Sequence, residues 1–444
     1  MKNIRAVSLG VGAALAVMSA SGTALAYGPE GVFSGRYPVD GAVNVRAPFS
    51  PVHPIRGQSV IERPRPDFDP TPIPVGSFQF FPAVTAGGWY DSNIFATDTN
   101  EKSDFVWNLR PSVGLFSNWS RHALALSAIG DIGLYTEHDD ENFYNGVFDA
   151  KGRIDVMRET WIKLNLGYQN LSESRSSPND VAGSEPTKFH VYRGGVTAYH
   201  GVGSVKLTGD YDFKRHAYED TPALGGSIVQ TTRNRDQNEL GGKVMYEFSP
   251  NFRPFVAGKV NSRHYDFNPL RNSDGFDVVG GSEMDFGGIV TGQAYVGYML
   301  QDYRRFASSD VDAVKFGGDA TWNITGLTSL TFEVERSIEE TTAGGVTNPL
   351  AYSSFLSTGG SATVTHELMR DLLLESNVSV TRNDFEGGVT DRADDTVGVG
   401  AGARYFFNRN FHADLNYDFA TRDSDVPTAR FDRHMVGVRL GAQM

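Results

Sequence analysis

Charged side chains recur at every second position along many segments, and this spacing limits the chemistry that the chain can do. Lys206, Asp210 and Asp212 share one parity within residues 203–217, whereas Leu207 has the other parity. Neighbouring side chains of an extended strand point to opposite faces, so this segment would carry one charged and one apolar face. A face of mixed cations and carboxylates can hydrogen-bond a hydrophilic solute, or it can form ion pairs across strands.

The same alternation in the other segments gives a set of candidate lumen-lining residues. Burying such charges unpaired in a dry core costs several kcal/mol each, whereas a water-filled lumen removes that cost. Solute contact and cross-strand pairing both stay open as roles for the set. Its acidic members are Asp149, Asp155, Asp210, Asp212, Glu239, Glu283, Asp285, Asp319, Glu333, Glu375, Asp414 and Asp418, its basic members are Lys151, Arg153, Lys163, Lys206, Lys243, Lys315, Arg404 and Arg439, and His412 shares their face.

Catalytic and metal-binding motifs are missing from the sequence. The ten histidines show no HExxH spacing, and no glycine-flanked serine forms a nucleophile elbow. The acidic runs at 139–142 and 394–395 lack the spacing of a calcium loop, and the chain has no cysteine for a thiolate site or disulfide. We therefore predict a protein that is not an enzyme and has neither a cofactor nor a metal site.

The elements that would position these side chains are long strands. About 18 alternating segments follow one another from Ser77 to the end of the chain, and most have 13 to 17 residues. A strand that crosses a membrane needs roughly 9 to 11 residues. In the segment 410–422, for example, Leu415 and Tyr417 alternate with Asp414 and Asn416. The pattern predicts an all-β fold, a transmembrane antiparallel up-and-down β-barrel of about 18 strands, with the apolar face toward lipid.

The connections between these segments alternate in length, which favours a membrane barrel over a soluble sandwich. Short turns such as 158–159 and 408–410 alternate with longer polar loops such as 92–103, 174–186 and 218–232. Outer-membrane barrels have short periplasmic turns and long external loops. An even number of strands then predicts that both termini lie in the periplasm.

The N-terminus predicts export from the cytoplasm. Residues 1–26 combine Lys2 and Arg5 with an apolar run and end in Ala24-Leu25-Ala26, which is typical of a signal peptide. Ten of the 20 prolines follow between residues 27 and 75. We expect this stretch to be a disordered periplasmic arm, either a plain tether or a docking segment for a periplasmic partner, and residues 76–444 to be the barrel.

Composition adds a broad constraint on partners. The net charge of −13 argues against a general nucleic-acid binder, and 49 glycines with 29 phenylalanines and 18 tyrosines suit many two-faced strands. The expected surroundings are outer-membrane lipid, with the barrel assembly machinery as an expected partner.

The first two strands carry a resemblance to a known family. The sequence WYDSNIF at 89–95 is followed by Ser103-Asp104 and by LRPSVGL at 109–115. This resembles the proteobacterial family of outer-membrane β-barrels known as β-barrel porins of the second type. Tyr90, Asn93, Asp104, Pro111 and Leu115 are among the matching positions. The chain departs from such barrels in ending at Met444 rather than at an aromatic residue.

The resemblance supplies an expected cargo, because several members of that family are linked to exopolysaccharide export. It implies a passive exit pore for a secreted polysaccharide in the outer membrane of a Gram-negative bacterium, with a periplasmic export component as a partner for residues 27–75. A diffusion porin for small hydrophilic solutes is the alternative, and a barrel enzyme or a structural anchor is a third. The residues themselves do not separate these functions.

Overall fold

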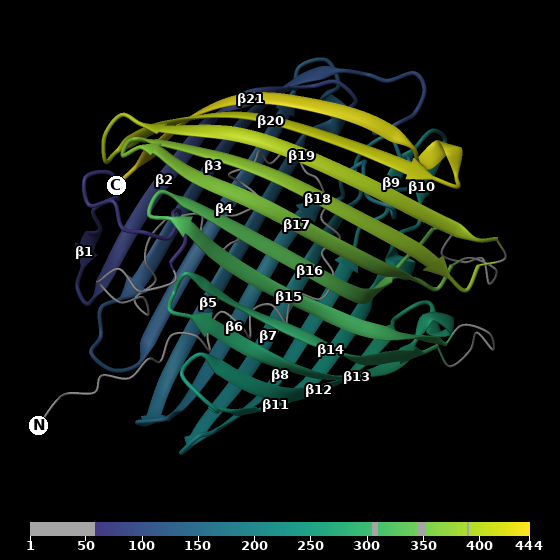
Figure 1. Ribbon diagram of the computed structural model, residues 1–444. Helices are drawn as coiled ribbons and strands as arrows, with labels where there is room; N and C mark the ends of the chain where they lie inside the picture. Colours follow the sequence, from purple (N-terminus) through teal and green to yellow (C-terminus); the bar gives the residue numbers. More distant parts are fainter. Residues whose placement is uncertain (1–57, 304–309, 344–351, 389) are drawn as a thin grey trace, which may run out of the picture.

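The fold is a closed antiparallel barrel (Figure 1). The computed structural model describes residues 58–303, 310–343, 352–388 and 390–444. Its main sheet has 19 strands, of which the short β1 (Ile73–Val75) only flanks β2, so 18 strands form the wall. The wall closes where the first of these strands pairs with the last, with Tyr90 opposite Val436. The predicted signal peptide and residues 27–57 of the predicted arm lie outside the described residues.

The wall strands have the lengths that the alternation predicts, 12 to 16 residues. They are β2 (Phe78–Asp91), β3 (Asp104–Ser117), β4 (Ala123–Tyr135), β5 (Phe143–Met157), β6 (Thr160–Ser172), β7 (Lys188–Val202), β8 (Val205–Tyr218), β11 (Arg235–Tyr246), β12 (Phe252–Tyr265), β13 (Ser273–Phe286), β14 (Val290–Asp302), β15 (Val311–Thr325), β16 (Thr328–Glu340), β17 (Ser354–Met369), β18 (Leu372–Glu386), β19 (Arg392–Phe406), β20 (Phe411–Ser424) and β21 (Phe431–Gln443).

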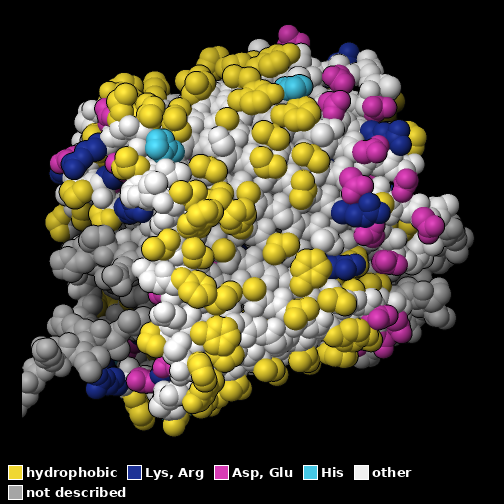
Figure 2. Space-filling model, in the orientation of Figure 1, with side chains coloured by type: hydrophobic (Ala, Val, Ile, Leu, Met, Phe, Trp, Pro, Cys, Tyr) yellow, Lys and Arg dark blue, Asp and Glu magenta, His cyan; other side chains and the backbone are white. Residues whose placement is uncertain are grey.

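The two faces of the wall differ as strand alternation requires. On β20, Leu415 is 54% exposed on the outside of the wall, whereas its neighbour Asp414 is 3% exposed on the inside. Figure 2 shows one side of the outer surface, where hydrophobic side chains cover the wall and charged side chains gather toward its rims. Among the described residues, no helix is long and apolar enough to cross a membrane.

The two ends of the barrel differ in their connections. One end, here called the short-turn end, carries turns such as 158–159, 203–204 and 326–327. The other, the long-loop end, carries connections such as 92–103, 173–187 and 219–234, the last of which contains the small hairpin of β9 (Thr221–Ala223) and β10 (Gly226–Ile228). Single turns of 3-10 helix, η1 (Asp139–Glu141), η2 (Thr231–Arg233), η3 (Pro269–Arg271) and η4 (Pro427–Ala429), also lie in loops of this end.

Residues 58–75 lie against the short-turn end. β1 pairs with the start of β2, with Val75 opposite Phe78. Val60 is completely buried and packs with Leu373 and Phe406, which come from the first residues of β18 and the last residue of β19. The sequence predicts an arm without fixed structure. In the structure, residues 58–75 of this stretch make defined contacts with the barrel, because apolar residues such as Val60 pack into an apolar site among the strand ends.

Candidate functional site: the barrel lumen

The inner face of the wall holds the predicted lumen-lining residues, and many of them form ion pairs between strands. Lys243 of β11 donates to Glu283 of β13 at 2.7 Å. Arg404 of β19 donates two hydrogen bonds to Asp414 of β20, at 2.6 and 2.9 Å. Lys315 lies 3.2 Å from Asp277. For these residues, pairing between strands explains the charges without any bound solute.

Other inner-face charges have no such partner among the described residues. Lys163 and Glu333 form no ion pair there, and Asp319 accepts a hydrogen bond only from the amide of Gln293, at 2.9 Å. Glu333 is exposed to the lumen. These groups are therefore available to a solute in the lumen.

Two like-charged pairs lie on different parts of the inner wall. Arg153 and Lys163 are directly opposite each other on β5 and β6, and Asp319 and Glu333 are directly opposite each other on β15 and β16. β5 is the fourth wall strand and β15 is the twelfth, eight positions apart in a ring of 18, so the two pairs face each other across the lumen. A solute between them would experience a transverse electric field.

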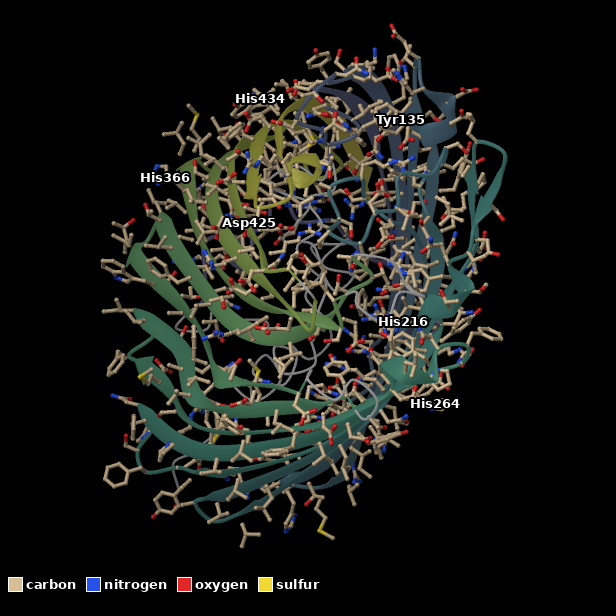
Figure 3. All side chains as sticks on the ribbon, turned by 90° about the vertical axis from the view of Figure 1, so that its right-hand side faces the viewer. Tyr135, His216, His264, His366, Asp425 and His434 are labelled. Carbon is tan, nitrogen blue, oxygen red and sulfur yellow. The ribbon has the colours of Figure 1, made fainter. Side chains whose placement is uncertain are left out.

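The long-loop end of the lumen is narrowed by the loop 173–187, which connects β6 and β7. It contacts several of its neighbours around the rim. Arg175 donates to Glu141 at 2.6 Å, and Glu173 accepts from Arg233 at 2.9 Å. The carbonyl of Ser176 accepts from Arg422 of β20 at 2.7 Å. These contacts bring the loop inside the circle of strands, and Figure 3, which looks at this end, shows side chains and loops across the opening.

A segment from the opposite wall meets this loop. At the end of β16, Glu340 accepts from Arg263 and Tyr265 of β12 at 2.5 Å each and from Tyr303 at 2.9 Å. β16 pairs with β15 only as far as Glu335, whereas its last residues stay paired with β17 up to Glu340 opposite Ser354.

The two parts join through one side chain. Oδ1 of Asn179 accepts from Oγ1 of Thr341 at 2.8 Å and from the backbone N–H of Thr342 at 2.9 Å. Arg271 of η3 holds the segment after β16 in place by donating to the carbonyls of Thr341 and Tyr352. We call the contact of loop 173–187 with residues 338–343 the lumen bridge.

Burial shapes the electrostatics of the loop. Burial opposes the charge of the Arg175 guanidinium, but its hydrogen bond with Glu141 and the charge of Asp180 raise the pKa of Arg175 above its ordinary value. Burial raises the pKa of the Asp180 carboxyl, and Arg175 opposes part of that rise. The ion pairs of Arg175 with Glu141 and Asp180 thus hold the loop in place.

The short-turn end is partly covered by residues 58–72. The backbone N–H of Val60 donates to Oγ of Ser329 at 2.7 Å, and Arg65 contacts Glu367 at 3.3 Å. Arg409 donates to the carbonyl of Pro66 at 2.9 Å. These partners lie at the starts or ends of β16, β17 and β20, so the segment follows the rim along one side of the opening. In an outer turn of the same end, the hydrogen bond from Lys206 lowers the pKa of Glu159.

Comparison with known proteins identifies the type of barrel. The family model described as "Putative beta-barrel porin 2" matches residues 65–444. This chain belongs to that family. It is therefore a porin-type barrel of the Gram-negative outer membrane, as the first two strands suggest.

Several solved structures are similar to this chain at low identity. OccAB3 of Acinetobacter baumannii is 10% identical, with a TM-score of 0.45 over 83% of this chain and 100% of that one. OpdO of Pseudomonas aeruginosa is 12% identical, with a TM-score of 0.44 over 83% and 98%. OccK2 of the same organism, solved with glucuronate, is 13% identical, with a TM-score of 0.45 over 82% and 98%. A search of curated proteins finds no match.

The predicted lumen-lining residues of this porin fall into two groups that differ in burial. Lys243, Glu283, Arg404, His412, Asp414, Asp418 and Arg439 are buried among other inner-face side chains, whereas Lys163, Lys206, Asp210, Asp212, Asp285, Lys315 and Asp319 are half-buried and Glu333 is exposed. In the part of the chain that the structure describes, no cluster of three or more histidine or acidic residues could hold a metal ion.

The lumen bridge is the part of the site that the sequence does not reveal. Asn179, Thr341 and Glu340 lie in or beside polar loops, and their composition resembles that of any exposed loop. Only the three-dimensional closure of the barrel brings residues 179 and 341 together. A weak signal exists in Arg271 and Arg175, two loop arginines next to apolar or small residues, since arginine commonly ties loops to carbonyls and carboxylates.

Proposed function

We propose that this porin is a passive channel for small hydrophilic solutes, with its short turns in the periplasm and its long loops outside the cell. The observation that carries the proposal is the combination of a charged inner wall with a lumen bridge. Barrels of 16 to 18 strands are wide enough for an aqueous channel. An inward-folded loop reduces that width at one level and leaves the rest of the lumen open to water.

Two oppositely charged pairs on facing parts of the wall support the same function. Lys163 and Arg153 on one wall face Asp319 and Glu333 on the other, so polar and charged solutes would be oriented as they pass. Ion-paired rows such as Arg404 and Asp414 would keep the wall rigid and hydrated. The channel needs no energy source, because it only equalises concentrations.

Export of an exopolysaccharide is the second candidate, and it rests on the resemblance of the first two strands to the family. A polymer chain that threads the lumen would have to part the contacts of Asn179 with Thr341 and Thr342. The predicted periplasmic partner would then dock on the short-turn end, where residues 58–75 lie. Residues 27–57 of the predicted docking arm are outside the described residues.

Liposome swelling separates the two candidates. Purified porin in liposomes should admit mono- and disaccharides and exclude long oligosaccharides. Deletion of the gene should leave surface polysaccharide unchanged. Loss of surface polysaccharide, restored by the wild-type gene, would favour the export function instead.

A further inference from the structure

Two cations on the inner face of β5 and β6 stand in an arrangement that is unfavourable without a ligand. Arg153 and Lys163 are directly opposite in the strand register. Like charges at directly opposed positions repel and destabilise a sheet. The only ion-pair partner of Arg153 among the described residues is Asp155, at 2.8 Å on its own strand, and none of them pairs with Lys163.

An aromatic pair fixes both cations in place. Trp161, the inner-face residue before Lys163, has the Lys163 ammonium 4.8 Å and the Arg153 guanidinium 5.4 Å from its ring centre. Its other neighbour is Tyr199 of β7, whose ring stacks on it with centroids 4.9 Å apart and planes 9° from parallel. Trp161 is 8% exposed, so it acts as a support beneath the cations rather than as a surface for a ligand.

Nearby carboxylates are directed elsewhere. Asp149, on the same face of β5, pairs with Arg193 at 2.9 Å. Asp210 of β8 is separated from Lys163 by Thr197 of β7, which is the residue opposite both. The cations therefore keep a net positive charge toward the lumen, in a part of the wall where both side chains are only half-buried.

We propose that Arg153 and Lys163 form a binding site for a carboxylate group of a small organic anion that passes through the lumen. The inference rests on the proposed channel function and adds the class of solute. A guanidinium whose Nε already binds Asp155 still has its Nη groups for an incoming oxygen, and the Lys163 ammonium can take the second oxygen. Trp161 is a positioning residue, because it holds both cations at the same level of the wall.

The test is a current recording with a matched pair of probes. Benzoate and its neutral isostere benzamide are added in turn to single channels of the full-length porin in a planar bilayer. Wild-type channels should be blocked briefly by benzoate and not by benzamide. Lys163→Gln and Arg153→Gln should each need about fivefold more benzoate for the same block, since each removes one partly exposed ionic contact. Trp161→Leu should weaken the block while both cations remain.

Controls separate this site from general lumen charge. Lys315→Gln removes a cation from the opposite wall, and Lys163→Arg keeps the charge at the proposed site, so both should respond to benzoate as the wild type does. Equal effects of benzoate and benzamide, or an unchanged block in both the Lys163→Gln and Arg153→Gln channels, would overturn the proposed site while leaving the channel intact. If the wild-type protein gave no current at all, the channel function itself would fail.

Discussion

At the scale of single residues, the inside and outside of the wall obey opposite rules. Leu415 on the outer face and Asp414 on the inner face are neighbours in sequence, yet one is largely exposed and the other is buried against Arg404. Lipid is the solvent on one side, and a polar lumen is the solvent on the other. This contrast predicts the effect of a charge at each position.

Leu415→Arg should destabilise the porin by about 2–4 kcal/mol, because it puts a cation on the lipid face near mid-strand. Glu333→Arg, which exchanges one exposed lumen charge for another, is its control and should change stability little. Asn416 is a poorer control, since it is only 4% exposed and an arginine there would lack room. Reversible urea unfolding in lipid vesicles measures both. Equal stability losses would contradict the assignment of the two faces.

Asp414→Asn should destabilise the porin by about 1–3 kcal/mol, because it leaves the buried guanidinium of Arg404 without its counter-charge. The matched control is Asp395→Asn, which removes an exposed partner of Arg382 and should cost less than about 0.5 kcal/mol. The same unfolding experiment measures the difference. Two equally small effects would show that the inner pair adds no stability.

At the scale of elements, the wall was predictable and the lumen contents were not. The alternation of apolar and polar residues predicts strands at 160–173 and 410–422, and the structure has them at Thr160–Ser172 and Phe411–Ser424. Period-two patterns report the local backbone and the two faces directly. The lumen bridge and the packing of residues 58–72 depend on contacts between distant segments, which local patterns do not contain.

Replacing residues 176–182 with a short Gly-Ser linker should increase single-channel conductance, because it removes Asn179 and its contacts with residues 341–342. Asn179→Ala should have a smaller effect in the same direction. A Gly-Ser replacement of the six-residue loop 425–430 serves as the control, since no described contact of that loop crosses the lumen. An unchanged conductance in the 176–182 variant would show that the bridge does not limit flow.

Removing residues 27–72 should leave a folded barrel, because the wall closes through β2 and β21 without that stretch. The variant should still shift on a gel when heated, as folded barrels do. Its conductance should rise, since the segment that contacts Ser329, Glu367 and Arg409 at the short-turn end is gone. Loss of the gel shift would mean that the segment is needed for assembly.

At the scale of the whole molecule, the closed wall and the contacts at its two ends together decide what can pass. The closed wall makes an outer face for lipid and an inner face for water, and the contacts at its two ends reduce the opening. The orientation, with termini in the periplasm, follows from the distribution of short and long connections and stays a prediction. An antibody tag in the loop 92–103 should be reached on intact cells, and a tag at the C-terminus should not.

The proposed channel function requires that the lumen conducts. Purified full-length porin inserted into a planar bilayer in potassium chloride should give discrete, repeated current steps, and the 176–182 variant should give larger ones. A protein that inserts and keeps its heat-dependent gel shift, yet gives no steps in either form, would contradict the proposed channel function.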